Sequence, residues 1–386
     1  MIRLQRPRWF GDSKRDPDRA RKIQKVRLLI SDTGGGHRAC ATALRDALIE
    51  TDADLHVDIV DGLRETGRFP IYRMPELYTR WSEKRNLWRT TFYLTNGRRL
   101  SNTLIYPWQR ISKQALGRAI SEGDPDLVVV LHPCLTYATY KTVQAMANRP
   151  RIATVVTDLV YGHASWFAHG ADRYYVPTEA MKRRALKQKI PREKIQLTGL
   201  PLASRLFELR TRRNQLRNEL GFERPSVICV GGADGMGIQR IAPALAKVSN
   251  SIDVHLVCGK NEELKRKLEA QNFGANIHLH GFVSNLPEML AASDMALIKA
   301  SPTVLMEALT VGAYVLLYDF VPGQEYPNVR FVQENGLGDF SRSPKAIVTK
   351  INEHFERLAH LPFEERAVNF VPQDGARTIA QELLRG

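Results

Sequence analysis

Residues 25–50 read KVRLLISDTGGGHRACATALRDALIE. The apolar run predicts a buried strand, the three glycines predict a turn, and the rest has the composition of a helix. Residues 226–248, SVICVGGADGMGIQRIAPALAKV, repeat the same order of apolar run, glycine-rich turn and helix. A strand followed at once by a glycine turn and a helix opens a Rossmann-like unit. The two stretches therefore predict an α/β protein built from two Rossmann-like domains with a cleft between them.

The rest of the chain alternates short strands with helices, as parallel sheets do. Further strands are expected at 55–60, 126–131, 152–157, 173–176 and 195–198, and then at 254–257, 277–279, 295–298 and 314–317. We assign residues 25–205 to the first domain, with an insertion at 64–118, and residues 206–360 to the second. Residues 1–24 are expected to form a basic N-terminal arm. Residues 361–386 are expected to form a C-terminal helix that packs back on the first domain.

The charge of the chain is concentrated in two segments. The 386 residues contain 56 Lys and Arg against 41 Asp and Glu, a formal net charge of +15. Residues 1–27 carry +7 and residues 64–118 carry +9, so the remainder sums to −1. With 43% hydrophobic residues the composition excludes a mainly disordered or collagen-like chain. The four cysteines form no CxxC pair, which favours reduced thiols over a disulfide or zinc framework.

The insertion at 64–118 is aromatic as well as basic. Five of its residues recur at three- and four-residue spacing, as on an amphipathic helix: Trp81, Arg85, Trp88, Arg89 and Phe92. Trp, Tyr and Arg favour the membrane–water boundary, and each basic residue near an anionic surface contributes about 1 kcal/mol. The alternative is a solvated basic face whose aromatics lie in a helix–helix core. No nucleic-acid-binding motif is present, so nucleic acid is not expected as the partner.

Each domain carries a glycine turn suited to chemistry. In the first, Gly35 and Gly36 precede His37, where a helix N-terminus would lower the pKa of the imidazole and keep it neutral as a proton acceptor. In the second, the turn contains Gly231, Gly232, Gly235, Met236 and Gly237. Four glycines in seven residues suggest a backbone wrapped around a diphosphate. A tight turn without a ligand is the alternative for the first cluster.

Two later segments of the second domain carry further candidates. A strand ends at Lys299, and Ser301, Pro302 and Thr303 form a good helix start, with Glu307 one turn into the helix. A carboxylate there suits the two hydroxyls of a ribose, although a solvated helix glutamate is the simpler interpretation. A polar loop then presents groups suited to sugar hydroxyls: Gln324, Glu325 and Asn328.

Weaker candidates have structural explanations beside the chemical ones. His132 and His163 are both weaker candidates; His132 closes a strand and faces either the acceptor or only its own loop. Asp124-Pro125-Asp126 has the spacing of a metal-binding DxD, but a proline turn that leads into the next strand accounts for it better.

Several motifs, in this order along the chain, resemble the monogalactosyldiacylglycerol synthases. They are SDTGGGHR at 31–38, VTDL at 156–159, TGLP at 198–201, GGxxGMG at 231–237, and GQE…NV at 323–329. That family has the GT-B fold and is related to the bacterial diacylglycerol glucosyltransferases and the lipid II-forming N-acetylglucosaminyltransferase. The resemblance covers about residues 25–340. Residues 75–96 resemble the acceptor-side insertion of the family, which favours the membrane interpretation of that segment.

The resemblance implies an inverting transfer of a hexose from UDP-galactose or UDP-glucose to the sn-3 hydroxyl of diacylglycerol, without a metal or other cofactor. It implies that the first domain holds the acceptor and that the second holds the donor. His37 would be the base, with Asp158 orienting it or the acceptor. The turn at 231–237 and residues 301–303 would hold the diphosphate, Glu307 the ribose, and Gln324 and Glu325 the hexose. Phe282 and Val283 stand where the family contacts uracil through backbone groups.

The resemblance also implies a peripheral protein on the cytoplasmic side of a membrane. Galactose is the expected sugar, but VCGKN at 257–261 and PGQE at 322–325 also resemble the glucosyl group. The loop before Glu307 has lost glycines that the family usually has, and Met306 replaces a small residue. Another membrane-lipid acceptor, or a non-catalytic UDP- and membrane-binding protein, therefore remains an alternative.

Overall fold

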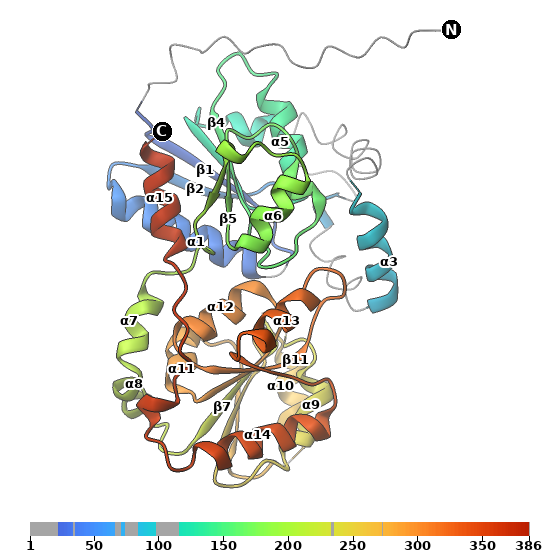
Figure 1. The fold of residues 1–386 in the computed structure, drawn as a ribbon, viewed down its shortest axis with the longest axis vertical. Helices are drawn as coiled ribbons and strands as arrows, with labels where there is room; N and C mark the ends of the chain where they lie inside the picture. The colour runs from blue at the N-terminus through green and yellow to red at the C-terminus, as the bar shows by residue number, and fades with distance from the viewer. Residues whose placement is uncertain are drawn as a thin grey trace.

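The computed structural model describes residues 22–33, 35–65, 71–73, 84–97, 116–232, 235–271 and 273–385. It contains two parallel six-stranded sheets flanked by helices, one above the other in Figure 1. Most of the predicted basic arm, Trp81 and much of the insertion lie outside the described residues.

The first sheet has the strand order β2-β1-β3-β4-β5-β6. Its strands are β1 (Lys25–Ile30), β2 (His56–Asp61), β3 (Leu127–Val130), β4 (Arg151–Val155), β5 (Arg173–Val176) and β6 (Ile195–Leu197). All six were expected from the sequence, within one or two residues at each end. Asp126 is structural, as predicted, because its carboxylate accepts hydrogen bonds from the backbone N–H groups of Gln24 and Lys25, each at 2.9 Å.

The second sheet has the order β12-β11-β10-β7-β8-β9. Its strands are β7 (Ser226–Val230), β8 (Asp253–Val257), β9 (Ile277–His280), β10 (Met295–Lys299), β11 (Tyr314–Asp319) and β12 (Gly338–Phe340). The first five match the sequence-based expectation. β12 was not predicted, because three residues reading GDF offer no apolar run and pair only with β11.

The helices that matter for the site follow strand ends. In the first domain they are α1 (Gly35–Thr51), α3 (Arg85–Thr95), α5 (Thr136–Val143) and α6 (Glu179–Lys187). α7 (Arg205–Thr211) and α8 (Arg213–Leu220) join the two sheets. The second domain adds α9 (Ile238–Leu245), α10 (Glu262–Glu269), α11 (Leu286–Ala292), α12 (Pro302–Thr310), α13 (Tyr326–Glu334) and α14 (Pro344–Leu358).

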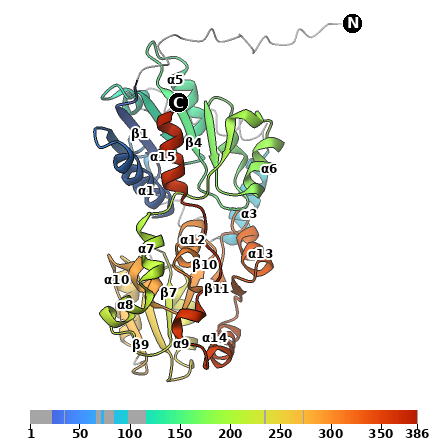
Figure 2. The same ribbon diagram turned by 60° about the vertical axis from the view of Figure 1, so that its left-hand side comes forward.

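The last helix, α15 (Gly375–Arg385), lies against α1 of the first domain (Figures 1 and 2). To reach it, the chain crosses back beside residues 198–201. Gly199 has φ +86°, and a Cβ there would lie 3.0 Å from the carbonyl oxygen of Gln373. A glycine in this conformation lets the two crossing segments touch.

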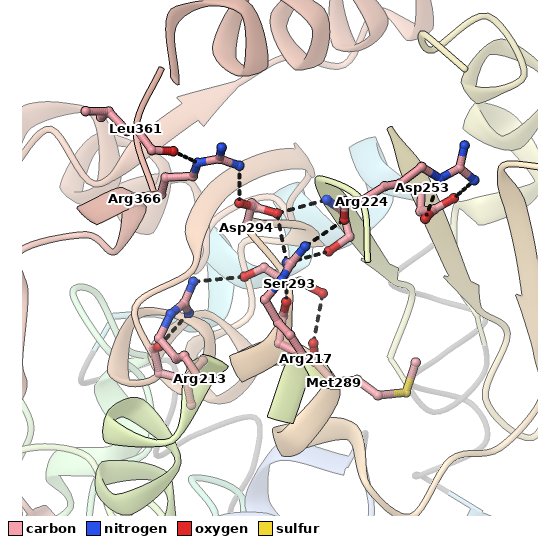
Figure 3. A network of polar contacts seen from close by, with 12 residues as sticks. Arg213, Arg217, Arg224, Asp253, Met289, Ser293, Asp294, Leu361 and Arg366 are labelled. Carbon is pink, nitrogen blue, oxygen red and sulfur yellow. Dashed lines mark hydrogen bonds and ion pairs between the residues drawn. The ribbon is translucent and has the colours of Figure 1, made fainter. Parts of the chain in front are cut away.

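A buried ion-pair network anchors the joining helices to the second domain (Figure 3). Asp294 is 1% exposed and lies just before β10. Its carboxylate pairs with Arg217 of α8 at 3.2 Å and with Arg366 at 3.0 Å, and it accepts a hydrogen bond from the Ser226 backbone N–H at 2.9 Å. Next to it, Arg213 donates to the carbonyl of Val311 at 2.8 Å. One carboxylate thus joins α8, β7 and the returning C-terminal chain.

Replacing Asp294 with Asn is expected to destabilise the second domain by about 3–5 kcal/mol, because two largely buried guanidinium groups lose their counter-charge. The free energy of unfolding in urea measures this. Glu334→Gln is the matched control, since its pair with Arg330 is exposed and worth less than about 1 kcal/mol. Equal losses in the two variants would contradict the proposed importance of burial.

Candidate active site

The N-terminal ends of α1 and α12 meet where the two domains touch. A Cβ on Gly36 would lie 2.8 Å from the Thr303 hydroxyl, and the Cys40 Sγ lies 3.7 Å from the same oxygen. Both helices follow the carboxyl end of a strand, where ligands of such sheets bind. The first turn of α1 therefore lies directly against the helix start that follows Lys299.

His37 is half-buried in the first turn of α1. Its Nδ1 lies 2.9 Å from the Thr157 hydroxyl, and its ring makes an edge contact with His132 at 4.6 Å. Burial lowers the pKa of His37 to about 4, although the Leu131 carbonyl and the charge of Asp32 oppose this. The imidazole is consequently neutral at neutral pH and has a lone pair for a proton.

His132 is a satisfied neighbour of His37. Its Nδ1 accepts a hydrogen bond from the Cys134 backbone N–H at 3.3 Å, so its Nε2 carries the proton toward the Thr33 hydroxyl at 2.8 Å. Burial, together with the nearby His37, holds the pKa of His132 well below its usual range. His163 is satisfied too, between Thr95 and Ser165. Both histidines fit the structural alternative considered for them.

Asp158 follows β4 and lies near the same interface. Its Oδ2 accepts a hydrogen bond from the Trp166 indole N–H at 2.7 Å. Burial raises the pKa of Asp158 to about 6, and the charge of Glu325 in the second domain adds to the effect. The hydrogen-bond partner of His37 is thus the preceding residue, Thr157, while Trp166 lies beside the His37 ring at 6.2 Å. Sequence reasoning did not single out Thr157 or Trp166, because only the fold brings them next to His37.

The glycine turn of the second domain leaves room above its backbone. Gly232 has φ +74°, and among the described residues, its own chain neighbours apart, no atom lies within 4 Å of a Cβ position. Gly237 caps α9 with φ +83° and approaches the Tyr318 ring, whose hydroxyl donates to the Met236 carbonyl at 2.7 Å. No side-chain hydrogen bond caps α9 in the described residues. The Ile238 and Arg240 N–H groups donate to the carbonyls of Gly235 and Gly237, each at 3.2 Å, and the helix start keeps the partial positive charge that attracts an anion.

The strand end at Lys299 supplies a cation and a second helix start. The Lys299 ammonium lies 3.2 Å from the Met236 Sδ, so β10 and the glycine turn face each other. Ser301 occupies the N-cap of α12 in an extended conformation without a side-chain capping bond, and Pro302 follows it. Asn328 stabilises this turn, because its Nδ2 donates a hydrogen bond to the Ala300 carbonyl at 2.8 Å.

Glu307 is half-buried on α12. Among the described residues no donor reaches its carboxylate within hydrogen-bond distance. Burial raises the pKa of Glu307 to about 7, and the charge of Arg205 partly offsets this rise. An acid held here without a protein partner suits a ligand that brings hydroxyl donors.

The remaining donor-side candidates line the same edge of the second sheet. Glu325 is buried, and its Oε2 accepts a hydrogen bond from the Val321 backbone N–H at 2.6 Å. Gln324 precedes it in the loop after β11. Phe282 follows β9 and is exposed, with the Lys260 ammonium 5.7 Å from its ring, whereas Val283 packs against the core.

The structure corrects the expectation for two residues of α3. Phe92 is only 3% exposed, and Arg85 is ion-paired with Asp319 of the second domain at 2.7 Å. Both therefore lie on the face of α3 that contacts protein and cannot meet a bilayer. Trp88 is half-buried, and Arg89 remains exposed.

Comparison with known proteins identifies the class. Residues 37–202 match the model of the monogalactosyldiacylglycerol (MGDG) synthases, and residues 213–361 match the glycosyl transferases group 1 model. Two solved structures share the fold. MurG from Acinetobacter baumannii has a TM-score of 0.57 at 12% identity and covers 94% of this chain and 100% of its own. UDP-GlcNAc 2-epimerase from Neisseria meningitidis, bound to UDP-GlcNAc, has a TM-score of 0.60 at 16% identity, covering 94% and 99%. The chain thus has the GT-B fold of a glycosyltransferase.

Relatives narrow the class to a family. Monogalactosyldiacylglycerol synthase 3 of Arabidopsis thaliana is 32% identical over 349 residues, which are 87% of this chain and 75% of that protein. The chain belongs to the monogalactosyldiacylglycerol synthase family. It spans between 64% and 75% of the length of the curated relatives that it matches.

Proposed function

We propose that the protein transfers a hexose, galactose in preference to glucose, from a UDP-sugar to the sn-3 hydroxyl of 1,2-diacylglycerol with inversion at the anomeric carbon. The observation that carries this proposal is the placement of His37. This neutral histidine directly follows Gly36, which contacts Thr303 at the helix start of the donor-side domain, and it is held by the Thr157 hydroxyl. Membership of the family supplies the substrate class.

In the proposed reaction His37 is the general base. With its Nδ1–H donating to Thr157, the Nε2 lone pair accepts the proton of the lipid hydroxyl. The hydroxyl oxygen attacks C1 of the hexose as the bond to UDP breaks, so the new bond forms on the opposite face and the configuration inverts. The imidazolium that forms is stabilised by the nearby charge of Asp32, which is itself held by Arg38 at 2.7 Å.

The departing UDP is proposed to be stabilised by backbone N–H groups and one lysine. The N-termini of α9 and α12 supply partial positive charge, and Lys299 lies between them. We propose no metal or other cofactor for this step. Glu307 would accept the two ribose hydroxyls, and Gln324 and Glu325 would read the hexose.

The test is a mass-spectrometric assay with diacylglycerol vesicles and each of the two donors. The wild-type protein is expected to form a monohexosyl glycolipid, faster with UDP-galactose, and to keep its activity in EDTA. His37→Ala should lower turnover by about 10²–10⁴-fold while UDP binding stays near normal. Absence of glycolipid with both donors would refute the function and favour the UDP- and membrane-binding alternative. Product only with another lipid would reassign the acceptor.

Glu307 predicts a pH dependence of UDP binding. With its pKa near 7, the carboxyl group is about half ionised at neutral pH and becomes protonated as the pH falls. The ionised form accepts hydrogen bonds from both ribose hydroxyls, so affinity should be full above pH 8 and up to about tenfold lower at pH 6. Calorimetry at both pH values measures this. In Glu307→Gln, the affinity for UDP should change with pH only through the titration of the UDP phosphate itself, near pH 6. If the affinity for UDP changed with pH equally in the variant and the wild type, Glu307 would not bind the ribose.

We also propose that the protein docks on an anionic bilayer at the cytoplasmic side as a peripheral protein. The exposed face of α3 carries Leu87, Tyr93 and Leu94 beside Arg89, within the basic insertion. Exposed apolar side chains next to a cation suit the boundary between headgroups and acyl chains. In the part of the chain that the structure describes, no helix is both long and apolar enough to span a bilayer.

Replacing Leu87 and Leu94 together with Ser is expected to weaken binding to vesicles containing anionic lipid by about tenfold or more, since two exposed leucines could no longer enter the bilayer. Vesicle sedimentation measures this, and raising the salt concentration should weaken the wild type as well. The matched control is Val371→Ser, which alters a side chain that is 60% exposed, close to the 61% of Leu94. Unchanged binding of the double variant would move the docking surface elsewhere.

A further inference from the structure

A carboxylate at the end of β11 joins the two domains. Asp319 is the last residue of that strand and pairs with three arginines. Arg240 at 3.6 Å and Arg342 at 3.2 Å belong to its own domain, but Arg85 at 2.7 Å comes from α3 of the first domain. Of these three partners, Arg85 alone reaches across the interface.

Arg85 also holds the next residue of the chain. Its Nη1 donates to the Phe320 carbonyl at 2.9 Å, and its guanidinium lies 4.7 Å from the centre of the Phe320 ring. A planar guanidinium that pairs, donates and stacks at once fixes the direction of the backbone more closely than a single ion pair. The backbone that leaves Asp319 toward Gln324 and Glu325 is therefore set by a side chain from the other domain.

Phe92, two turns further along α3, contacts the same loop. A Cβ on Gly323 would lie 2.6 Å from the Cδ1 of Phe92, and Gly323 has φ +96°. Only a glycine permits both the close approach and this backbone conformation. The Phe92 ring is held in place by His163, with the ring centroids 5.4 Å apart.

We propose that Arg85 and Phe92 are positioning residues for the donor hexose. By holding residues 319–323, they set where Gln324 and Glu325 meet the sugar, and so they affect recognition of the hexose without touching it. This inference rests on the proposed function, in which residues 324 and 325 read the sugar. The groups proposed for the UDP moiety, on α9 and α12, are not among the contacts of Arg85 and Phe92 described above.

The two parts of the donor should therefore respond differently to variants of α3. Calorimetry with UDP alone and with UDP-galactose, both without acceptor or vesicles, separates the hexose contribution from the nucleotide contribution. In Arg85→Gln the dissociation constant for UDP should stay within about twofold. That for UDP-galactose should rise about tenfold, which corresponds to about 1.4 kcal/mol. Phe92→Leu keeps an apolar side chain but loses the ring that contacts Gly323. It should therefore also weaken the binding of UDP-galactose more than that of UDP.

Arg342→Gln is the matched control. Arg342 pairs with the same carboxylate oxygen of Asp319 as Arg85 does, but it belongs to the second domain. Both dissociation constants should stay within about twofold in this variant. Intact UDP binding also shows that each variant is folded.

Three results would overturn the inference. The first is an equal loss of affinity for UDP and UDP-galactose in the α3 variants, which would indicate a general structural role. The second is no change in either dissociation constant in these variants. The third is a wild type that binds UDP and UDP-galactose with the same affinity. Failure of the proposed function gives another pattern, in which UDP-galactose binds and responds to Arg85→Gln as expected but no glycolipid forms.

Discussion

The site depends on the contact between the N-termini of α1 and α12. Both helix ends carry unpaired N–H groups and partial positive charge, so bringing them together is unfavourable unless an anion lies nearby. The chain allows the approach by having no side chain at Gly36, which faces the Thr303 hydroxyl. This constraint places His37, the next residue, beside the groups proposed for the diphosphate. The base proposed in one domain and the anion site proposed in the other thus become neighbours.

The same contact needs a fixed relation between domains that are built as separate sheets. The chain provides it by crossing the interface twice, through α7 and α8 and then back to α15. At each crossing, close contacts between side chains or backbone fix the position of the chain. Asp294 ties α8 and Arg366 to the second sheet, and Gly199 lets the outgoing and returning segments touch. Burying charged groups costs free energy, but removing one partner of a buried ion pair costs more, because it leaves the other charge unpaired. The pairing therefore favours this one arrangement of the two segments.

Most of the strands and glycine turns could be predicted from the sequence, because they are determined by residues next to one another in the chain. Strands such as β7 and turns such as 231–237 are determined by neighbouring residues, through apolar runs and glycines. His37 lies in the first turn of a helix, and Glu307 lies one turn into another, and the sequence also marks both helix starts. Thr157, Trp166 and Asp319 could not be found in this way, because their significance comes from residues far away in the chain. An Asp at a strand end has the same local pattern whether it faces water or three arginines.

α3 shows most clearly where a sequence pattern stops being informative. The spacing of its aromatic and basic residues correctly predicts an amphipathic helix, but it does not say what each face contacts. Arg85 and Phe92 are used within the protein, which leaves Leu87, Arg89, Tyr93 and Leu94 on the outside. The net charge of the insertion therefore overstates the attraction to a bilayer, since an arginine already paired with a carboxylate adds little to it. On α3, exposed apolar side chains should therefore contribute more to the proposed membrane binding than charge does. The helix proposed to touch the membrane is also the one that holds the loop proposed to read the sugar.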